Sequence, residues 1–180
     1  MKKYYILDMD GTLCDSMSFW RKESQHIVDF SEIEKVEPVY DKMREHYRNE
    51  VVLKEGAADF LEKAKAAGIK MCIATGTRRD IAQPFLERTG LLDYMEFYID
   101  CYDVNSYKDK PDIYLKAAER LGADAAECVV FEDSEYCAVT AKSAGFYVVG
   151  VFDSVTSTEG DVERYSDCFV KDWKSVKDLF

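Results

Sequence analysis

The chain has 180 residues, of which 47% are apolar and 33% charged, with a net charge of −11. This composition is typical of a folded globular protein, and the length allows one core with a small insertion. Since nucleic acids and anionic membranes attract positive patches, the absence of a basic run argues against both as partners. The sequence has no apolar stretch of the roughly 20 residues that a membrane span needs. Its start, MKKYYILDMDG, does not read as a signal peptide, so we expect a cytoplasmic protein.

Short apolar runs alternate with helical patterns along most of the chain. The runs predict strands over 4–8, 69–75, 96–101, 127–133, 146–151 and 167–170. Helices are expected over 57–67, 80–88, 113–121 and 134–144, each followed by a glycine, which is a common helix stop. This alternation predicts an α/β fold with a mostly parallel sheet that is covered on both faces.

One segment, 15–52, interrupts this alternation after the first strand. It predicts two helices, the first over 16–30 and the second beginning near Pro38, because proline favours the first helical turn. We therefore expect a helical insertion at 15–52 in a core made of 1–14 and 53–180. Near the other end, the composition of 153–161 predicts a loop.

The cysteines are widely spaced and form no CxxC pair, which predicts reduced cysteines in the core rather than disulfides. They are Cys14, Cys72, Cys101, Cys128, Cys137 and Cys168.

Polar side chains follow the predicted strands at the point where each strand ends. The carboxyl ends of parallel strands lie at one edge of the sheet, where α/β proteins bind their ligands. The residues expected there are Asp8, Asp10 and Gly11 after the first strand, Thr75 and Gly76 after the second, Lys108 and Lys110 after the third, and Glu132 and Asp133 after the fourth.

The four carboxylates of this set would repel one another and raise their own pKa values if left alone. A bound hard divalent cation would offset this repulsion, and a set of ligands that are all oxygen atoms favours Mg²⁺. Such a metal also attracts phosphate, and phosphoryl transfer needs a nucleophile, a proton donor and positive charge. Asp8 can supply the nucleophile and Asp10 the acid or base.

Thr75 adds a hydrogen bond and a lysine adds positive charge, while Gly11 lets the backbone approach closely. Each feature alone has a simpler interpretation. Asp8-Met9-Asp10-Gly11 could form a turn, and Glu132-Asp133 could cap a helix. Their joint occurrence at successive strand ends favours a phosphoryl-transfer site.

The segment Asp8-Met9-Asp10-Gly11-Thr12-Leu13-Cys14-Asp15-Ser16 resembles DxDGTLxDS, the first motif of the haloacid dehalogenase-like (HAD) superfamily. Thr75 resembles the second motif, Lys108-Asp109-Lys110-Pro111-Asp112-Ile113-Tyr114 the third and Glu132-Asp133-Ser134 the fourth. The resemblance covers residues 4 to about 151. It implies a Rossmann-like, three-layer HAD core of the phosphatase and β-phosphoglucomutase-like branch, with 15–52 as a short helical cap.

The resemblance also implies a Mg²⁺-dependent phosphatase of small phosphorylated metabolites. In such a mechanism Asp8 forms an aspartyl-phosphate, and Asp10 protonates the leaving group and then activates water. The metal ligands would be Asp8, Asp133 and the main-chain carbonyl of Asp10, with Glu132 assisting directly or through water. Substrate contacts are expected from Gly11, Thr75, Gly76 and Lys108.

Either lysine could match the third motif. A gapless match of Pro111-Asp112-Ile113-Tyr114 selects Lys108, whereas a gapped match selects Lys110; we favour Lys108 because Pro111 is expected to begin the next helix. Three other functions remain open: a β-phosphoglucomutase-like phosphohexomutase, a receiver-like signalling domain and a non-catalytic binding protein. The sequence names neither the substrate nor the oligomeric state, monomer or homodimer.

Overall fold

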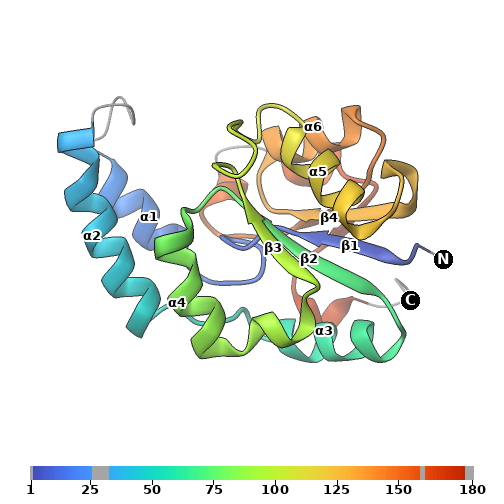
Figure 1. The fold of residues 1–180 in the computed structure, drawn as a ribbon, viewed down its shortest axis with the longest axis horizontal. Helices are drawn as coiled ribbons and strands as arrows, with labels where there is room; N and C mark the ends of the chain where they lie inside the picture. The colour runs from blue at the N-terminus through green and yellow to red at the C-terminus, as the bar shows by residue number, and fades with distance from the viewer. Residues whose placement is uncertain (1, 26–32, 159–160, 177–180) are drawn as a thin grey trace.

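The computed structural model describes residues 2–25, 33–158 and 161–176. Its centre is one sheet in which every pair of neighbouring strands is parallel, in the order β3-β2-β1-β4-β5-β6 (Figure 1). The strands are β1 Tyr4–Leu7, β2 Lys70–Thr75, β3 Phe97–Asp100, β4 Cys128–Glu132, β5 Tyr147–Val151 and β6 Cys168–Val170. The strand order reverses direction between β1 and β4, which is where such sheets open a crevice for ligands. The predicted α/β, Rossmann-like fold is confirmed.

Helices cover both faces of the sheet because successive side chains of a strand point to opposite faces. In β1, Tyr5 packs in one cluster with Phe60 of α3, and Ile6 packs in another with Tyr114 of α5. The helices on the first face are α3 Ala57–Ala66 and α4 Arg79–Thr89, and those on the second are α5 Asp112–Leu121, α6 Glu135–Ser143 and α7 Val162–Tyr165.

Glycines end two of these helices in the predicted way. Gly90 after α4 and Gly122 after α5 adopt left-handed φ angles of 69° and 76°, and their N–H groups bond carbonyls of the last turn. Short 3-10 helices complete the connections: η1 Leu91–Tyr94, η2 Ala125–Glu127, η3 Thr156–Thr158 and η4 Trp173–Ser175. The predicted loop 153–161 therefore contains one helical turn, which the Asp153 side chain caps by accepting from Val155 N at 2.8 Å.

The insertion contains two helices, α1 Met17–Ser24 and α2 Ile33–Asn49. The prediction that the second helix begins near Pro38 is wrong, because Pro38 lies inside α2. Burial of the apolar face of α2 offsets the stability that is lost because the proline cannot donate a main-chain hydrogen bond. The part of the predicted first helix over 26–30 lies outside the described residues. We call α1 and α2 together the inserted hairpin.

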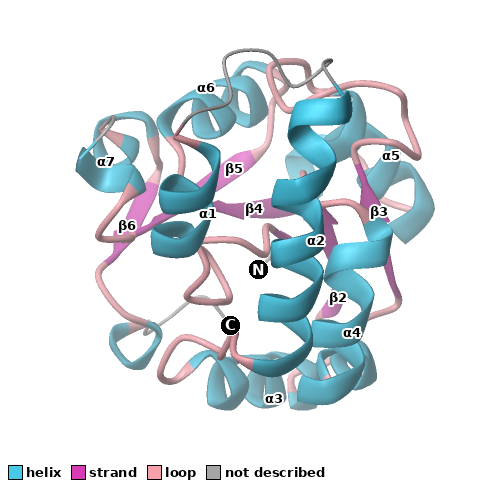
Figure 2. Ribbon diagram, turned by 90° about the vertical axis from the view of Figure 1, so that its left-hand side faces the viewer, coloured by secondary structure: helices cyan, strands magenta, loops and turns pink. Residues whose placement is uncertain are grey.

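The inserted hairpin packs on the core rather than standing apart from it. In both ribbon views α2 runs beside α4, and α1 lies in front of the sheet when the molecule is seen from the hairpin side (Figures 1 and 2). Side chains of α2 belong to the same buried cluster as the α3 and α4 face of the sheet. They are Val36, Val39, Tyr40, Met43 and Tyr47.

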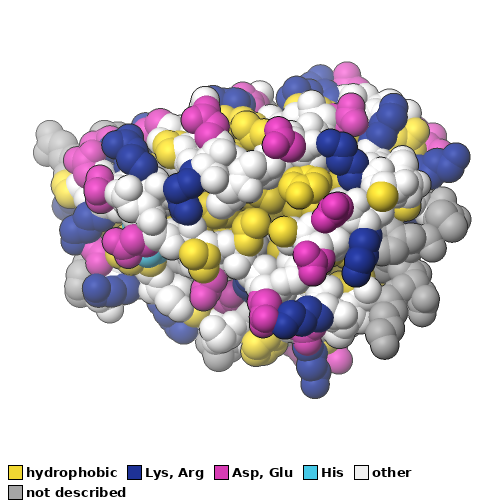
Figure 3. All heavy atoms as spheres, turned by 90° about the horizontal axis from the view of Figure 1, so that it is seen from below, with side chains coloured by type: hydrophobic (Ala, Val, Ile, Leu, Met, Phe, Trp, Pro, Cys, Tyr) yellow, Lys and Arg dark blue, Asp and Glu magenta, His cyan; other side chains and the backbone are white. Residues whose placement is uncertain are grey.

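On the face seen in Figure 3, basic and acidic side chains are interspersed without accumulation of one charge, and apolar side chains gather near the middle of the face. Among the described residues, no helix combines the length and apolarity needed to cross a bilayer. All six cysteines are free thiols; Cys168 is half-buried and the other five are buried, which confirms their predicted place in the core.

Candidate active site

Three carboxylates meet at the carboxyl edge of the sheet, beside the reversal of strand order. Asp8 follows β1, Glu132 ends β4 and Asp133 comes next, so strand pairing brings together residues more than 120 positions apart. One ligand oxygen from each lies within 4.8 Å of the other two, and the three residues are 1–6% exposed. This all-oxygen set suits a hard divalent cation, because the cation would offset the repulsion of three buried charges.

Gly11 makes room for this cluster. It has a left-handed φ of 76°, and a Cβ added there would lie 2.1 Å from Asp133 Oδ2. Any larger residue would therefore displace the Asp133 carboxylate.

Asp133 is held from two sides by hydroxyl groups. Thr156 Oγ1 donates to Asp133 Oδ2 at 2.7 Å, and Thr12 Oγ1 donates to Oδ1 at 3.3 Å. Neither role was predicted from the sequence. Thr12 is part of the first motif, but nothing in the sequence marked Thr156, which η3 places there.

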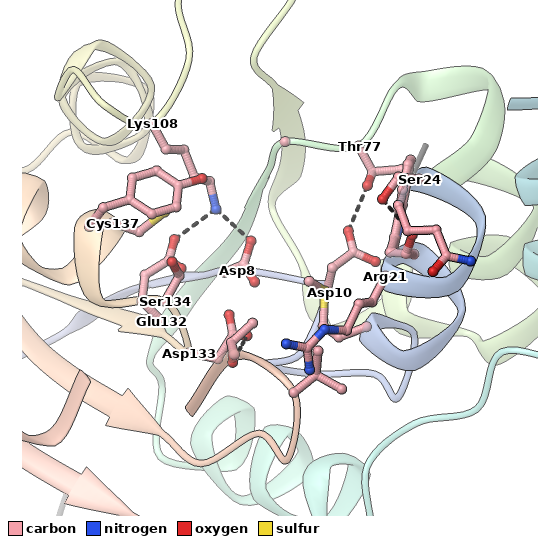
Figure 4. Close-up of a pocket in the computed structure, with 17 residues that line it drawn as sticks. Asp8, Asp10, Arg21, Ser24, Thr77, Lys108, Glu132, Asp133, Ser134 and Cys137 are labelled. Carbon is pink, nitrogen blue, oxygen red and sulfur yellow. Dashed lines mark hydrogen bonds and ion pairs between the residues drawn. The ribbon is translucent and has the colours of Figure 1, made fainter. Parts of the chain in front are cut away.

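Lys108 is the buried cation of the site. Its Nζ donates to Asp8 Oδ1 at 2.5 Å and to Glu132 Oε1 at 2.7 Å (Figure 4). Tyr114 donates to the same Glu132 oxygen at 2.7 Å. Lys110 is exposed to solvent. The geometry thus brings Lys108, and not Lys110, to the acidic cluster.

Burial and the neighbouring charges both shift the pKa values of these groups. Burial raises the pKa of the Asp8 carboxyl well above its usual value, and Glu132 raises it further, although Lys108 opposes the shift. Burial, followed by the charge of Glu132, raises the pKa of Asp133 to about 7. For Lys108, burial lowers the pKa, but Asp8 and Glu132 outweigh it and the pKa lies well above its usual value.

Asp10 is held by hydroxyl groups from three parts of the chain. Ser16 Oγ donates to Asp10 Oδ1 at 2.7 Å, and the Tyr47 hydroxyl donates to the same oxygen. Thr77 Oγ1 donates to Oδ2 at 2.7 Å, and Thr75 Oγ1 does so at 3.3 Å. Sequence analysis missed Ser16, Tyr47 and Thr77 as partners of Asp10.

Thr75 itself is fully buried, and its Oγ1 also accepts from Thr77 N at 3.0 Å. The next two residues, Gly76 and Thr77, line the cavity described below. The predicted contact of Thr75 with substrate stays a prediction, and Thr77 is a second hydroxyl at the same strand end.

A cavity of about 570 Å³ opens above these groups. Figure 4 shows Asp8, Lys108 and Glu132 on one side, Asp10 and Thr77 on the other, and Arg21 of α1 close to Asp10. Helix α1 supplies Met17, Trp20, Arg21 and Ser24 to the lining, together with Gln25 directly after it, and α6 supplies Tyr136 and Cys137. Sequence analysis did not identify Arg21 as a cationic group of this cavity.

The fold and the acidic cluster define an α/β protein with three carboxylates at the carboxyl edge of its parallel sheet that could hold a metal ion. The sequence model of the family described as haloacid dehalogenase-like hydrolase matches residues 16–145. The chain therefore belongs to the haloacid dehalogenase-like hydrolase family, as its motifs predicted.

Individual relatives agree with this assignment. The chain is 34% identical over 135 residues to Protein CbbY of Rhodobacter capsulatus, covering 72% of this chain and 55% of that protein. It is 35% identical over 123 residues to Phosphorylated carbohydrates phosphatase of Thermotoga maritima, covering 67% and 57% respectively. The chain thus spans little more than half the length of these two relatives.

A solved structure shares the fold over its whole length. It is a haloacid dehalogenase-like hydrolase from Bacteroides fragilis, with a TM-score of 0.81 and 23% identity, covering 98% of this chain and 100% of that one.

Proposed function

We propose that this protein is a Mg²⁺-dependent phosphatase that hydrolyses a small phosphomonoester through an aspartyl-phosphate on Asp8. The observation that carries the proposal is the position of the Asp8 carboxylate, which lines the cavity beside the Lys108 ammonium and the Glu132–Asp133 pair. A nucleophile, a fixed cation and a set of metal ligands are the parts that phosphoryl transfer requires.

In the first step Asp8 attacks phosphorus, a bond forms between its carboxylate oxygen and phosphorus, and the bond to the leaving oxygen breaks. Asp10 gives its proton to that leaving oxygen. In the second step Asp10 takes a proton from water, which attacks the aspartyl-phosphate and releases inorganic phosphate and free Asp8. Lys108 offsets the charge of Asp8 and of the transferring phosphoryl oxygens.

Asp8, Asp133 and the main-chain carbonyl of Asp10 would hold Mg²⁺, with Glu132 assisting directly or through water. The ion would neutralise phosphoryl charge and orient the substrate. Gly11, Thr75 and Gly76 are the proposed substrate-binding residues besides Lys108.

The proposed substrates are phosphorylated carbohydrates and similar small metabolites. The cavity volume of about 570 Å³ suits a molecule of this size. Its lining from the inserted hairpin combines the Trp20 ring with the polar Arg21 and Ser24 side chains, a mixture that suits a hydroxylated, anionic molecule. The name of the Thermotoga maritima relative, Phosphorylated carbohydrates phosphatase, points to the same class.

The test is phosphate release from p-nitrophenyl phosphate with Mg²⁺, followed by a panel of sugar phosphates. Wild-type protein should release phosphate, and the folded Asp8→Asn variant should not. Hexose phosphate isomerisation without phosphate release would identify a phosphomutase instead. No turnover of any panel member by the folded, Mg²⁺-loaded protein would support a non-catalytic binding protein.

A further inference from the structure

A tyrosine of the inserted hairpin contacts the carboxylate proposed as the acid of the reaction. Tyr47 lies in the last turns of α2, is fully buried, and its hydroxyl meets Asp10 Oδ1. Trp20 of α1 donates from Nε1 to the same hydroxyl at 2.6 Å. The contact therefore links both helices of the inserted hairpin to a core residue that follows β1.

The direction of these hydrogen bonds follows from the chemistry of the donors. An indole N–H can only donate, so the Tyr47 oxygen accepts from Trp20. The single phenolic proton of Tyr47 is then directed to Asp10. Ser16 donates to the same carboxylate oxygen at 2.7 Å, so Oδ1 has two protein donors.

The two oxygens of Asp10 have different surroundings. Tyr47 is 0% exposed and Ser16 1%, so the donors to Oδ1 lie below the surface. Thr77, which donates to Oδ2 at 2.7 Å, lines the cavity together with Asp10, and the buried Thr75 donates to the same oxygen at 3.3 Å. Figure 4 shows the Thr77–Asp10 bond at the side of the cavity. Oδ2 is thus the oxygen with a donor in the cavity wall, whereas neither Tyr47 nor Ser16, the donors to Oδ1, lines the cavity.

We propose that Tyr47 is a positioning residue that fixes Asp10 by Oδ1, so that Oδ2 carries the proton to the leaving group. This inference rests on the proposed function, in which Asp10 is the acid. As the bond between phosphorus and the leaving oxygen breaks, the proton moves from Oδ2 to that oxygen and Asp10 becomes a carboxylate. The Thr75 and Thr77 hydroxyls, which both donate to Oδ2, can rotate their own protons away while Oδ2 holds its proton.

The Tyr47 side chain is well fixed for this role. Its ring meets Phe85 of α4 edge-on, with centroids 6.2 Å apart. Its main-chain carbonyl accepts from Arg88 at 3.2 Å. Because α2 is attached to α4 in this way, the hydroxyl has a defined place relative to β1.

The test compares kcat/KM of Tyr47→Phe for two substrates with different leaving groups. p-Nitrophenyl phosphate has a stable leaving anion and needs little protonation, whereas glycerol 1-phosphate has a poor one that depends on the acid. We expect a loss with glycerol 1-phosphate at least about tenfold greater than with p-nitrophenyl phosphate, within the range of general acid catalysis. Equal losses with both substrates, or no loss, would overturn the inference.

Tyr40→Phe is the matched control. Tyr40 is a buried tyrosine of the same helix that does not line the cavity, and Arg78 lies 4.7 Å from its ring centre. It should keep the wild-type ratio of the two kcat/KM values. A change in the ratio equal to that of Tyr47→Phe would also contradict a specific role for the Tyr47 hydroxyl.

Two further variants distinguish loss of folding, a wrong assignment of the acid and a wrong positioning role for Tyr47. Tyr47→Phe leaves the Trp20 N–H without its acceptor, so Trp20→Phe/Tyr47→Phe removes both partners and guards against loss of folding. The double variant should still lose more kcat/KM with glycerol 1-phosphate than with p-nitrophenyl phosphate, and equal losses would count against the inference. Asp10→Asn should show an even larger difference between the losses of kcat/KM with the two substrates. If Asp10→Asn loses equally with both substrates, the proposed acid itself is wrong. If only the Tyr47 variants lose equally with both, the positioning role is wrong.

Discussion

The Lys108 ammonium lies 2.5 Å from Asp8 Oδ1, although the two residues are 100 positions apart in the sequence. Both side chains are buried, with exposed fractions of 5% for Lys108 and 7% for Asp8. A buried carboxylate without a partner would take up a proton, and a protonated Asp8 could not attack phosphorus. The ion pair therefore favours the charged form of the proposed nucleophile and opposes the rise in its pKa that burial and Glu132 cause.

The two lysines of the third motif should differ sharply in their effect on activity. Lys108→Ala should lower kcat/KM by at least about a hundredfold, the scale of losing one major electrostatic stabiliser. Lys110→Ala should change kcat/KM by less than about tenfold, since an exposed lysine away from the cluster contributes little. Steady-state kinetics of both folded variants check this, and the reverse ranking would move the catalytic cation to Lys110.

Metal binding should depend on Gly11. Gly11→Ala would place a Cβ 2.1 Å from Asp133 Oδ2, so we expect at least about tenfold weaker Mg²⁺ binding, equivalent to about 1.4 kcal/mol. Gly68→Ala is the matched control because Gly68 has a similar φ of 78° but nothing within 4 Å of the added Cβ. Calorimetric titration with Mg²⁺ measures both variants. Equal weakening in the two would assign the effect to backbone strain rather than to Asp133.

Removal of the metal should make stability depend on pH. The pKa of Asp133 is raised by burial from 3.8 in the unfolded reference to about 7 in the folded protein. The folded state therefore binds more protons, so this contribution to stability is complete below about pH 4 and is lost as the pH rises through about 7. We expect EDTA-treated protein to melt at a lower temperature at pH 8 than at pH 6.

Added Mg²⁺ should reverse this loss, and activity that EDTA abolishes should return with it. At a hundredfold excess over Kd the ion contributes about 2.7 kcal/mol to the free energy of unfolding. Thermal melts at the two pH values give the comparison. A metal-free protein that is more stable at pH 8, or full activity in EDTA, would contradict a metal site at these carboxylates.

Arg21 should influence the choice of substrate. It lies on α1, lines the cavity and is near Asp10 in Figure 4. Arg21→Gln keeps a long polar side chain but removes the charge, so it should raise KM most for substrates with a second anionic group. Kinetics with sugar monophosphates and bisphosphates measure the effect. An unchanged ranking of KM values would exclude Arg21 from substrate selection.

The sequence predicted the sheet well, because buried parallel strands are short apolar runs. Asp8, Glu132 and Asp133 lie at the ends of such runs and meet as expected. The fourth expected carboxylate, Asp10, is instead surrounded by hydroxyl donors and is not part of this group. The start of α2 was predicted wrongly at Pro38, since burial of an apolar face outweighed the usual place of proline. That local preference is weak compared with tertiary packing.

Partners that depend on distant packing could not be predicted. Tyr47 reaches Asp10 only because α2 packs beside α4, and Thr156 reaches Asp133 only through the turn that Asp153 caps. Neither residue lies in a motif. The role of Thr77 could have been predicted more easily, because Thr77 lies two positions after the predicted Thr75. The hydroxyl groups of both threonines donate to the same Asp10 oxygen.

In the proposed mechanism Asp8 carries the phosphoryl group during turnover. Mass spectrometry of protein that is quenched in acid during steady-state hydrolysis tests this directly. We expect the peptide containing Asp8 to gain the mass of one phosphoryl group, and the folded Asp8→Asn protein, mixed with the same substrate, to show no such gain. Turnover without this modification, or an Asp8→Asn variant that keeps more than about a tenth of wild-type activity, would contradict nucleophilic catalysis by Asp8.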